Sequence, residues 1–174
     1  KSYFAGGCFW CTESTFNEIK GVQKVISGYC NGNTENPTYE EICTGTTNHA
    51  EAIEVEYDET QITYQDLLNI FFTVHDPTTL NQQGNDRGTQ YRSAIFFTTE
   101  EEKQQAEKTI ESLNSNNTFP SPIVTEVTKL DIFYPAEAKH QSYFENNPQN
   151  PYCSFIIAPK LGKLRQKWKH LLKD

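Results

Sequence analysis

A tight turn near the N-terminus constrains the fold of this chain more than any other feature. Residues 3–5 form a short apolar run that is typical of a strand, and a helical pattern of apolar positions follows over about residues 9–20. Gly6 and Gly7 lie between the two, and paired glycines allow a sharp strand-to-helix turn. We therefore expect Cys8 to lie at or beside the N-terminus of the helix.

This position gives the Cys8 thiol a specific chemistry. The positive end of a helix macrodipole can lower a thiol pKa from ~8.5 to about 3.5–7.5. The two bulky aromatic residues that follow, Phe9 and Trp10, can form the wall of an apolar pocket beside the sulfur. The sequence thus predicts a reactive thiolate that faces a small apolar ligand. The alternative is an inert buried cysteine, since free cysteine is among the most buried residue types.

Cys11 follows Cys8 at the spacing Cys-x-x-Cys, which has three interpretations. Helix positions i and i+3 bring the two Cα atoms to roughly 5–6 Å, so the pair could form a disulfide. Cys8 could instead be a nucleophile that becomes a sulfenic acid, onto which another cysteine condenses. A zinc site would need a second close pair, which the remaining cysteines do not supply: Cys30, Cys43 and Cys153. We therefore expect neither a metal nor a cofactor.

In the segment from His49 to Tyr57, Glu51 occupies a position that the alternating pattern otherwise gives to apolar residues. The segment alternates, so that Ile53 and Val55 share one face of a predicted strand, and Glu51 belongs to the same face. A carboxylate on a buried face is costly unless it is paired or protonated, and burial raises its pKa. Glu51 could therefore act as a neutral proton donor near pH 7. If the strand begins one or two residues later, Glu51 is simply solvated.

The composition limits the classes of function. The chain has 174 residues, 13% aromatic residues and a net charge of −8, which suits one globular domain over residues 1–174 and argues against nucleic acid as the main partner. No apolar run reaches the ~18–20 residues that span a bilayer, so we expect no membrane partner. Five cysteines are an odd number and favour a reducing compartment, and we expect a cytoplasmic protein.

The remaining patterns alternate between strands and helices, and long polar loops separate them. We expect an α+β fold with a two-layer arrangement, in which helices pack against a mixed sheet. Thr63 and Thr99 are expected to begin two of the helices, because each is followed three residues later by an acidic residue in the capping-box position. Further elements are strands at 22–30, 91–98 and 123–130, a short helix at 136–144, a basic amphipathic helix from about residue 160, and long loops at 31–48 and 78–90.

Several motifs, taken together, resemble one protein family. In chain order they are Gly-Cys-Phe-Trp at 7–10, Pro-Thr-Tyr at 37–39, His-Ala-Glu at 49–51, Gln-Gly-Asn-Asp-x-Gly-Thr-Gln-Tyr-Arg-Ser at 83–93, Ala-Glu-x-x-His-Gln at 136–141 and Tyr-Cys at 152–153. Their types and order are similar to those of the A-type peptide methionine sulfoxide reductases, from Tyr3 to at least Cys153. The resemblance implies a ferredoxin-like sheet. Asn48 departs from the glycine that is common in the family, although asparagine tolerates a positive φ.

The resemblance implies a role for each candidate site residue. The implied substrate is the S epimer of methionine sulfoxide, free or in proteins. Cys8 attacks its sulfur and Glu51 protonates its oxygen. The acid is needed because the oxygen must be protonated or hydrogen-bonded before it can leave. The remaining roles concern substrate binding: Tyr39 and Tyr91 hydrogen-bond the oxygen, Asp86 acts through water, and Phe9 and Trp10 hold the S-methyl group.

The resemblance also implies how the enzyme is regenerated. Release of methionine leaves a sulfenic acid on Cys8, a second cysteine forms a disulfide with it, and thioredoxin reduces that disulfide. Cys153 matches the usual resolving position, and Cys11 is the alternative; a monomer is expected. Two other classes of function stay open: a thioredoxin-like disulfide oxidoreductase built on Cys8 and Cys11, and a redox-sensing binding module.

Overall fold

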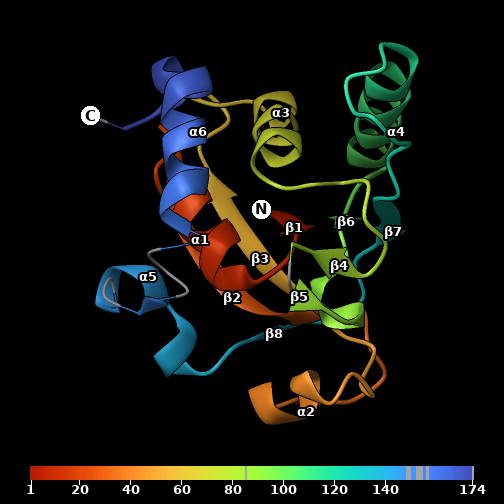
Figure 1. Ribbon diagram of the computed structural model, residues 1–174, viewed down its shortest axis with the longest axis vertical. Helices are drawn as coiled ribbons and strands as arrows, with labels where there is room; N and C mark the ends of the chain where they lie inside the picture. The colour runs from red at the N-terminus through yellow and green to blue at the C-terminus, as the bar shows by residue number, and fades with distance from the viewer. Residues whose placement is uncertain (85, 148–149, 152–154, 156, 174) are drawn as a thin grey trace.

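The chain folds into a mixed sheet with helices packed against it, as the computed structural model in Figure 1 shows. The structure describes residues 1–84, 86–147, 150–151, 155 and 157–173. The strands are β1 (Ser2–Ala5), β2 (Val22–Cys30), β3 (Ala50–Tyr57), β4 (Gln82–Gln83), β5 (Asp86–Arg87), β6 (Ala94–Phe97), β7 (Glu126–Lys129) and β8 (Phe133–Pro135). The α-helices are α1 (Phe9–Asn17), α2 (Tyr39–Cys43), α3 (Tyr64–Val74), α4 (Glu100–Ser115), α5 (Tyr143–Asn146) and α6 (Ala158–Trp168), and the 3₁₀ helices are η1 (Thr89–Tyr91), η2 (Ala138–His140) and η4 (Lys169–Leu171).

The main sheet has six strands in the order β7-β6-β1-β3-β2-β8. Strands β6 and β7 are parallel, and the other neighbouring pairs are antiparallel, so the sheet is mixed. The succession β1-α1-β2-β3-α3-β6 is the β-α-β-β-α-β pattern of ferredoxin-like folds, with β1 and β3 at the centre of the sheet. These findings confirm the predicted α+β fold.

The pairing of β2 with β3 determines which way Glu51 faces. Tyr29 lies opposite Glu51, and the register shifts between residues 22 and 24 at the start of β2. Because side chains alternate along a strand, Glu51 shares its face with Ile53 and Val55, which are fully buried in the main core. The opposite face of the sheet carries smaller buried side chains, among them Ala5, Cys30, Ala50, Ala52 and Ala94.

Helices α1, α3 and α6 cover the face of the sheet to which Glu51 belongs (Figure 1). The predicted capping box of α3 is present: Thr63 Oγ1 accepts a hydrogen bond from the Asp66 N–H at 3.1 Å, and the Asp66 carboxylate accepts one from the Thr63 N–H. Phe71 of α3 packs on Phe4 of β1, with ring centroids 5.3 Å apart. The apolar face of the capped helix α3 thus packs directly on the central strand β1.

Helix α6 is the basic amphipathic helix that the sequence predicts near residue 160. Leu161 and Leu164 are buried in the core, while most of the basic side chains are exposed. Trp168 Nε1 donates a hydrogen bond to Thr73 Oγ1 of α3 at 2.9 Å, which fixes the end of α6. Among the described helices, none combines the length and the apolar character that crossing a membrane would need.

Four predicted elements differ from the structure: one helix, two loops and one strand. Helix α1 ends at Asn17, three residues before Lys20. The loop predicted at 31–48 contains α2, and the loop predicted at 78–90 contains the hairpin of β4 and β5. The strand predicted at 91–98 begins only at Ala94, because Tyr91 ends the 3₁₀ helix η1.

Two further elements differ in the second half of the chain. The strand predicted at 123–130 is limited to β7, and the helix predicted at 136–144 is divided into η2 and α5. Strand β8 is absent from the prediction, since it has three residues, ends in proline and shows no alternating pattern. Its pairing with β2 completes the edge of the sheet beside the candidate site.

Candidate active site

The turn before Cys8 is built as the paired glycines predict. Gly7 has a φ of +89°, and Cys8 is the N-cap residue of α1 with extended φ and ψ of −64° and 129°. A Cβ atom on Gly7 would lie 2.7 Å from Gln83 Cγ, and one on Gly6 would lie 3.1 Å from the ring of His75. Close packing and backbone conformation therefore both require a glycine at position 7, whereas a side chain at position 6 would crowd the His75 ring.

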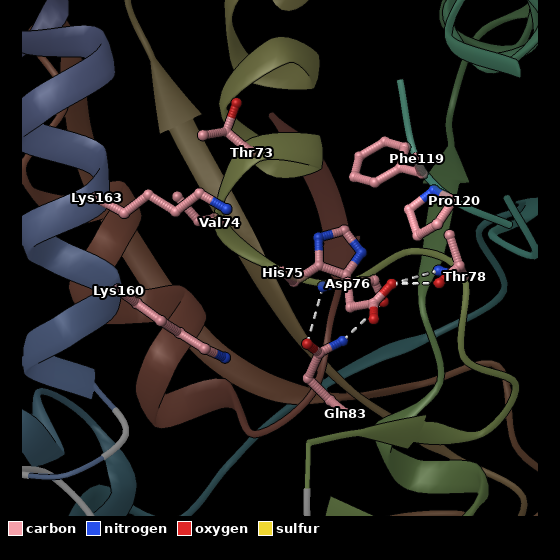
Figure 2. Close-up of a pocket in the computed structure, with 10 residues that line it drawn as sticks. All are labelled: Thr73, Val74, His75, Asp76, Thr78, Gln83, Phe119, Pro120, Lys160 and Lys163. Carbon is pink, nitrogen blue, oxygen red and sulfur yellow. Dashed lines mark hydrogen bonds between the residues drawn. The ribbon is translucent and has the colours of Figure 1, made fainter. Parts of the chain in front are cut away.

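Gln83 and His75 pack against this turn, and Figure 2 shows both side chains together with Asp76. The Gln83 amide accepts a hydrogen bond from the Asp76 N–H at 2.8 Å and donates one to the Asp76 carbonyl at 2.9 Å. The buried His75 ring hydrogen-bonds the Ser93 hydroxyl at 2.7 Å, and burial lowers its pKa to about 4. The cavity in Figure 2, about 350 Å³ in volume, is lined in part by Gln83 and His75, and none of the predicted catalytic residues lines it.

Glu51 is buried against the N-terminus of α1, as the parity of its strand predicts. Glu51 is 1% exposed, and its Oε1 accepts a hydrogen bond from the Phe9 N–H at 3.1 Å. Burial raises the pKa of the Glu51 carboxyl to about 8; the Phe9 hydrogen bond opposes this shift and the charge of Asp86 adds to it. Oε2 is buried as well, and no described residue hydrogen-bonds it. At pH 7 the group is mostly a neutral acid, and one of its two buried oxygens lacks a hydrogen-bond partner among the described residues.

The predicted lowering of the Cys8 pKa is wrong. Cys8 is 6% exposed, and burial, a hydrogen bond with Cys11 and the negative charge of Glu51 together raise the pKa of its thiol well above the ordinary value. A hydrogen bond from the main chain of Trp10 at the helix N-terminus acts in the opposite direction but is the weaker influence. The sequence pattern identified the helix terminus correctly, but it contained no measure of how deeply the sulfur is buried.

Two tyrosines complete the polar part of the site. Tyr39 is the first residue of α2, and Tyr91 is the last residue of η1. Burial raises the pKa of both phenols, and the negative charges of Glu51 and Cys8 raise it further. Both tyrosines are therefore protonated hydrogen-bond donors at neutral pH. Asp86 lies in β5 and acts on the Glu51 carboxyl through its charge.

Aromatic rings surround the helix terminus. Phe9 is fully buried and contacts the ring of Tyr39, with centroids 6.3 Å apart. Trp10 stacks on Tyr143 with centroids 3.7 Å apart, and its Nε1 donates a hydrogen bond to His140 Nδ1 at 3.2 Å. An open cavity of about 560 Å³ adjoins these rings, and its lining comprises Trp10, Tyr39, Glu40, Cys43, Lys139, His140 and Tyr143.

His140 and Tyr143 are absent from the predicted site, although both lie against Trp10. His140 belongs to the Ala-Glu-x-x-His-Gln motif at residues 136–141, but no site role is predicted for that motif, and Tyr143 lies outside it. They reach the site because β8, which precedes them, pairs with β2 and directs the chain back toward α1.

The cysteines occupy different environments. Cys11 is 2% exposed and hydrogen-bonds the Cys8 thiol, whereas Cys30 is buried on the opposite face of the sheet. Cys43 is exposed at the end of α2. Cys153, the predicted resolving residue, lies outside the described residues.

The chain is similar to known proteins along most of its length. A family model described as peptide methionine sulfoxide reductase matches residues 1–172. Peptide methionine sulfoxide reductase MsrA of Ruthia magnifica subsp. Calyptogena magnifica is 59% identical over 162 residues, covering 93% of this chain and 96% of the relative. The crystal structure of Mxr1 from Saccharomyces cerevisiae in reduced form matches with a TM-score of 0.82 at 35% identity, and the match covers 87% of each chain.

The same yeast protein has been solved in complex with Trx2, and that structure matches with a TM-score of 0.58 at 25% identity over 82% of each chain. The family model covers nearly the whole chain, and the bacterial relative shares more than half of its aligned residues. This chain therefore belongs to the peptide methionine sulfoxide reductase family.

Proposed function

We propose that this protein reduces the S epimer of methionine sulfoxide, free or within proteins, to methionine, and so repairs oxidised polypeptides. One observation carries the proposal: a buried carboxyl with a pKa of about 8, Glu51, lies at the N-terminus of the helix that begins after Cys8. A thiol alone does not reduce a sulfoxide readily, because the sulfoxide sulfur becomes a good electrophile only when its oxygen is protonated or strongly hydrogen-bonded.

The proposed reduction balances without an external redox partner. The Cys8 sulfur attacks the sulfoxide sulfur while Glu51 supplies a proton to the sulfoxide oxygen. The attack forms a bond between the two sulfur atoms, and the substrate oxygen, which takes up the Glu51 proton and the thiol proton, leaves as water. A water molecule then attacks the Cys8 sulfur, the bond between the two sulfurs breaks, the substrate leaves as a thioether, and Cys8 becomes a sulfenic acid. The proton that this water releases restores the neutral Glu51. Tyr39 and Tyr91 donate hydrogen bonds to the sulfoxide oxygen, and Asp86 acts on it through water.

The apolar walls account for the proposed choice of substrate. Phe9 and Trp10 would hold the S-methyl group, and the stacking of Trp10 on Tyr143 keeps the indole ring in one orientation. A pocket of fixed shape beside a fixed acid accepts only one arrangement of methyl group and oxygen around the sulfur. This supports selection of the S epimer.

The proposed regeneration uses a second cysteine and thioredoxin. A thiol attacks the sulfenic acid of Cys8, forming a disulfide and releasing water, and thioredoxin then reduces the disulfide by thiol exchange. We assign the resolving role to Cys153 on the basis of the Tyr-Cys motif at residues 152–153. Cys11 is the alternative, since its thiol already hydrogen-bonds that of Cys8. The yeast relative solved with Trx2 supports thioredoxin as the reductant.

A single-turnover assay tests the proposal. Separated S and R epimers of a methionine sulfoxide peptide are mixed with the reduced protein without added reductant, and methionine and free thiols are counted. We expect one methionine per chain from the S epimer only, with loss of two thiols. Formation of methionine from the R epimer would contradict the stereochemical assignment.

The close contact of Cys8 and Cys11 favours one other function, that of a disulfide oxidoreductase. In the same experiment this function predicts no methionine from either epimer and reduction of insulin disulfides by the dithiol. That result would overturn the proposed sulfoxide reduction.

A further inference from the structure

Glu137 lies outside the group of predicted site residues, yet its carboxylate links two segments that build the site. Oε1 accepts a hydrogen bond from the Tyr29 hydroxyl of β2 at 3.1 Å, and Oε2 accepts one from the Tyr39 N–H of α2 at 3.2 Å. Resting on the proposed reduction, we propose that Glu137 is a positioning residue that fixes the Tyr39 hydroxyl toward the sulfoxide oxygen.

Helix α2 needs such an external contact because it is too short to maintain its own orientation. It has five residues, and isolated helices of this length are unstable in water. Its first N–H groups have no partners within the helix. Thr38 accepts one of them, from Glu41, at 3.2 Å, and Glu137 accepts the one from Tyr39. Ile42, 1% exposed, anchors the C-terminal end of the helix, so the Glu137 bond controls the opposite end, which carries the Tyr39 side chain.

The second bond of the carboxylate connects Tyr39 with the wall of the site. The Tyr29 ring is fully buried and contacts Phe9, with centroids 5.6 Å apart. A displacement of Glu137 would therefore change the position of α2 relative to the start of α1. Burial alone would raise the pKa of the Glu137 carboxyl, but its hydrogen bonds outweigh burial and lower it, so both oxygens remain acceptors at neutral pH.

The backbone of Glu137 extends the same link to His140. Glu137 is the N-cap residue of η2, and its carbonyl accepts a hydrogen bond from the His140 N–H at 2.9 Å. The His140 ring lies 4.3 Å from the Tyr39 ring and accepts the hydrogen bond from Trp10 Nε1. One residue thus joins the donor Tyr39 to the aromatic ring Trp10, although these residues are far apart in the sequence.

Glu137→Gln is the first variant to test, because glutamine keeps the shape and loses one acceptor and the charge. In the single-turnover assay with the S epimer at saturating concentration, we expect methionine formation to slow about tenfold or more, since small displacements of positioned groups can reduce rates up to about 100-fold. In a Tyr39→Phe background, the same substitution should cost about twofold or less. If Glu137 had a purely structural role, Glu137→Gln would slow methionine formation by the same factor in both backgrounds.

Glu54→Gln is the matched control. Glu54 also accepts a hydrogen bond from a tyrosine, Tyr3, at 2.8 Å, but on the opposite face of the sheet, and we expect its rate within about twofold of wild type. Tyr29→Phe is the second variant if Glu137→Gln does not fold. It removes only a hydroxyl and should slow the reaction by at least about threefold, again only where Tyr39 is present.

The outcomes separate this inference from the proposed function. An active wild type with an unchanged Glu137→Gln variant, or with equal losses in both backgrounds, overturns the positioning role alone. A wild type that forms no methionine overturns the proposed reduction and this inference with it.

Discussion

The Phe9 N–H donates a hydrogen bond to Glu51 Oε1 at 3.1 Å, and this bond places a carboxyl group at the N-terminus of α1 beside Cys8. It satisfies one of the N–H groups that have no partner within the helix. The other carboxyl oxygen, Oε2, has no hydrogen-bond partner among the described residues. One hydrogen bond thus orients the acid, and Oε2 is the oxygen that would face the sulfoxide in the proposed reaction.

Glu51→Gln should nearly abolish methionine formation. Glutamine can still accept the Phe9 hydrogen bond but cannot supply a proton, and general acid catalysis contributes about 10²–10⁴-fold to such reactions. We expect a loss of this size in the single-turnover rate with the S epimer. Glu56→Gln, on the same strand but the other face, is the control and should react normally. A Glu51→Gln variant with wild-type turnover would remove the acid from the mechanism.

The stability of the protein should fall with rising pH because of Glu51. Its pKa is 4.5 ordinarily and about 8 when folded, so the folded state holds a proton that the unfolded state has lost between these values. The contribution of Glu51 is complete below pH 4.5, declines by up to about 1.4 kcal/mol per pH unit, and is lost above pH 8. Urea unfolding of wild type and Glu51→Gln between pH 5 and 9 should show the variant gaining relative stability as the pH rises. A constant difference would contradict the raised pKa.

Gly7→Ala should destabilise the protein by roughly 2–4 kcal/mol, the sum of an unfavourable positive φ and of crowding against Gln83. Gly45→Ala is the matched control, since Gly45 has a φ of +74° but nothing within 4 Å of an added Cβ atom. It should lose only the backbone part, about 1–2 kcal/mol. Urea unfolding measures both, and equal losses would show that Gln83 yields to the new methyl group.

Cys153→Ser and Cys11→Ser should separate the two candidate resolving residues. Without Cys153 the protein should still form one methionine per chain but stop after one turnover with thioredoxin, and a small external thiol should restore cycling. Cys11→Ser should continue to cycle with thioredoxin. Steady-state methionine formation with each reductant measures this, and the reverse pattern would transfer the resolving role to Cys11.

The parts of the site that follow local patterns are the parts that sequence reasoning predicts well. Cys8 lies at a helix N-terminus because two glycines permit the turn, and Glu51 is buried because alternation along β3 leaves it no other face. Both arguments need only the nearest few residues. The αL conformation of Asn48, with a φ of 57°, is of the same kind.

The sequence does not predict the features of the site that depend on contacts between residues far apart in the chain. Helix α2 is held by Glu137, 98 residues from Tyr39, and His140 meets Trp10 across 130 residues. The raised pKa of Cys8 has the same origin, because its cause is the depth to which other segments bury the sulfur. The dipole of α1 is visible in the sequence, but the protein that surrounds the thiol is not.

The register of β2 against β3 links the acid of the site to the packing of the core. A slip of one residue would exchange the two faces of β3 and move Glu51 among the alanines on the far side of the sheet. The same slip would turn Glu54 and Glu56 toward the main apolar core, so it is strongly disfavoured. The carboxyl beside Cys8 therefore belongs to the same strand register that buries Ile53 and Val55, and a molecule that lost the one would lose the other.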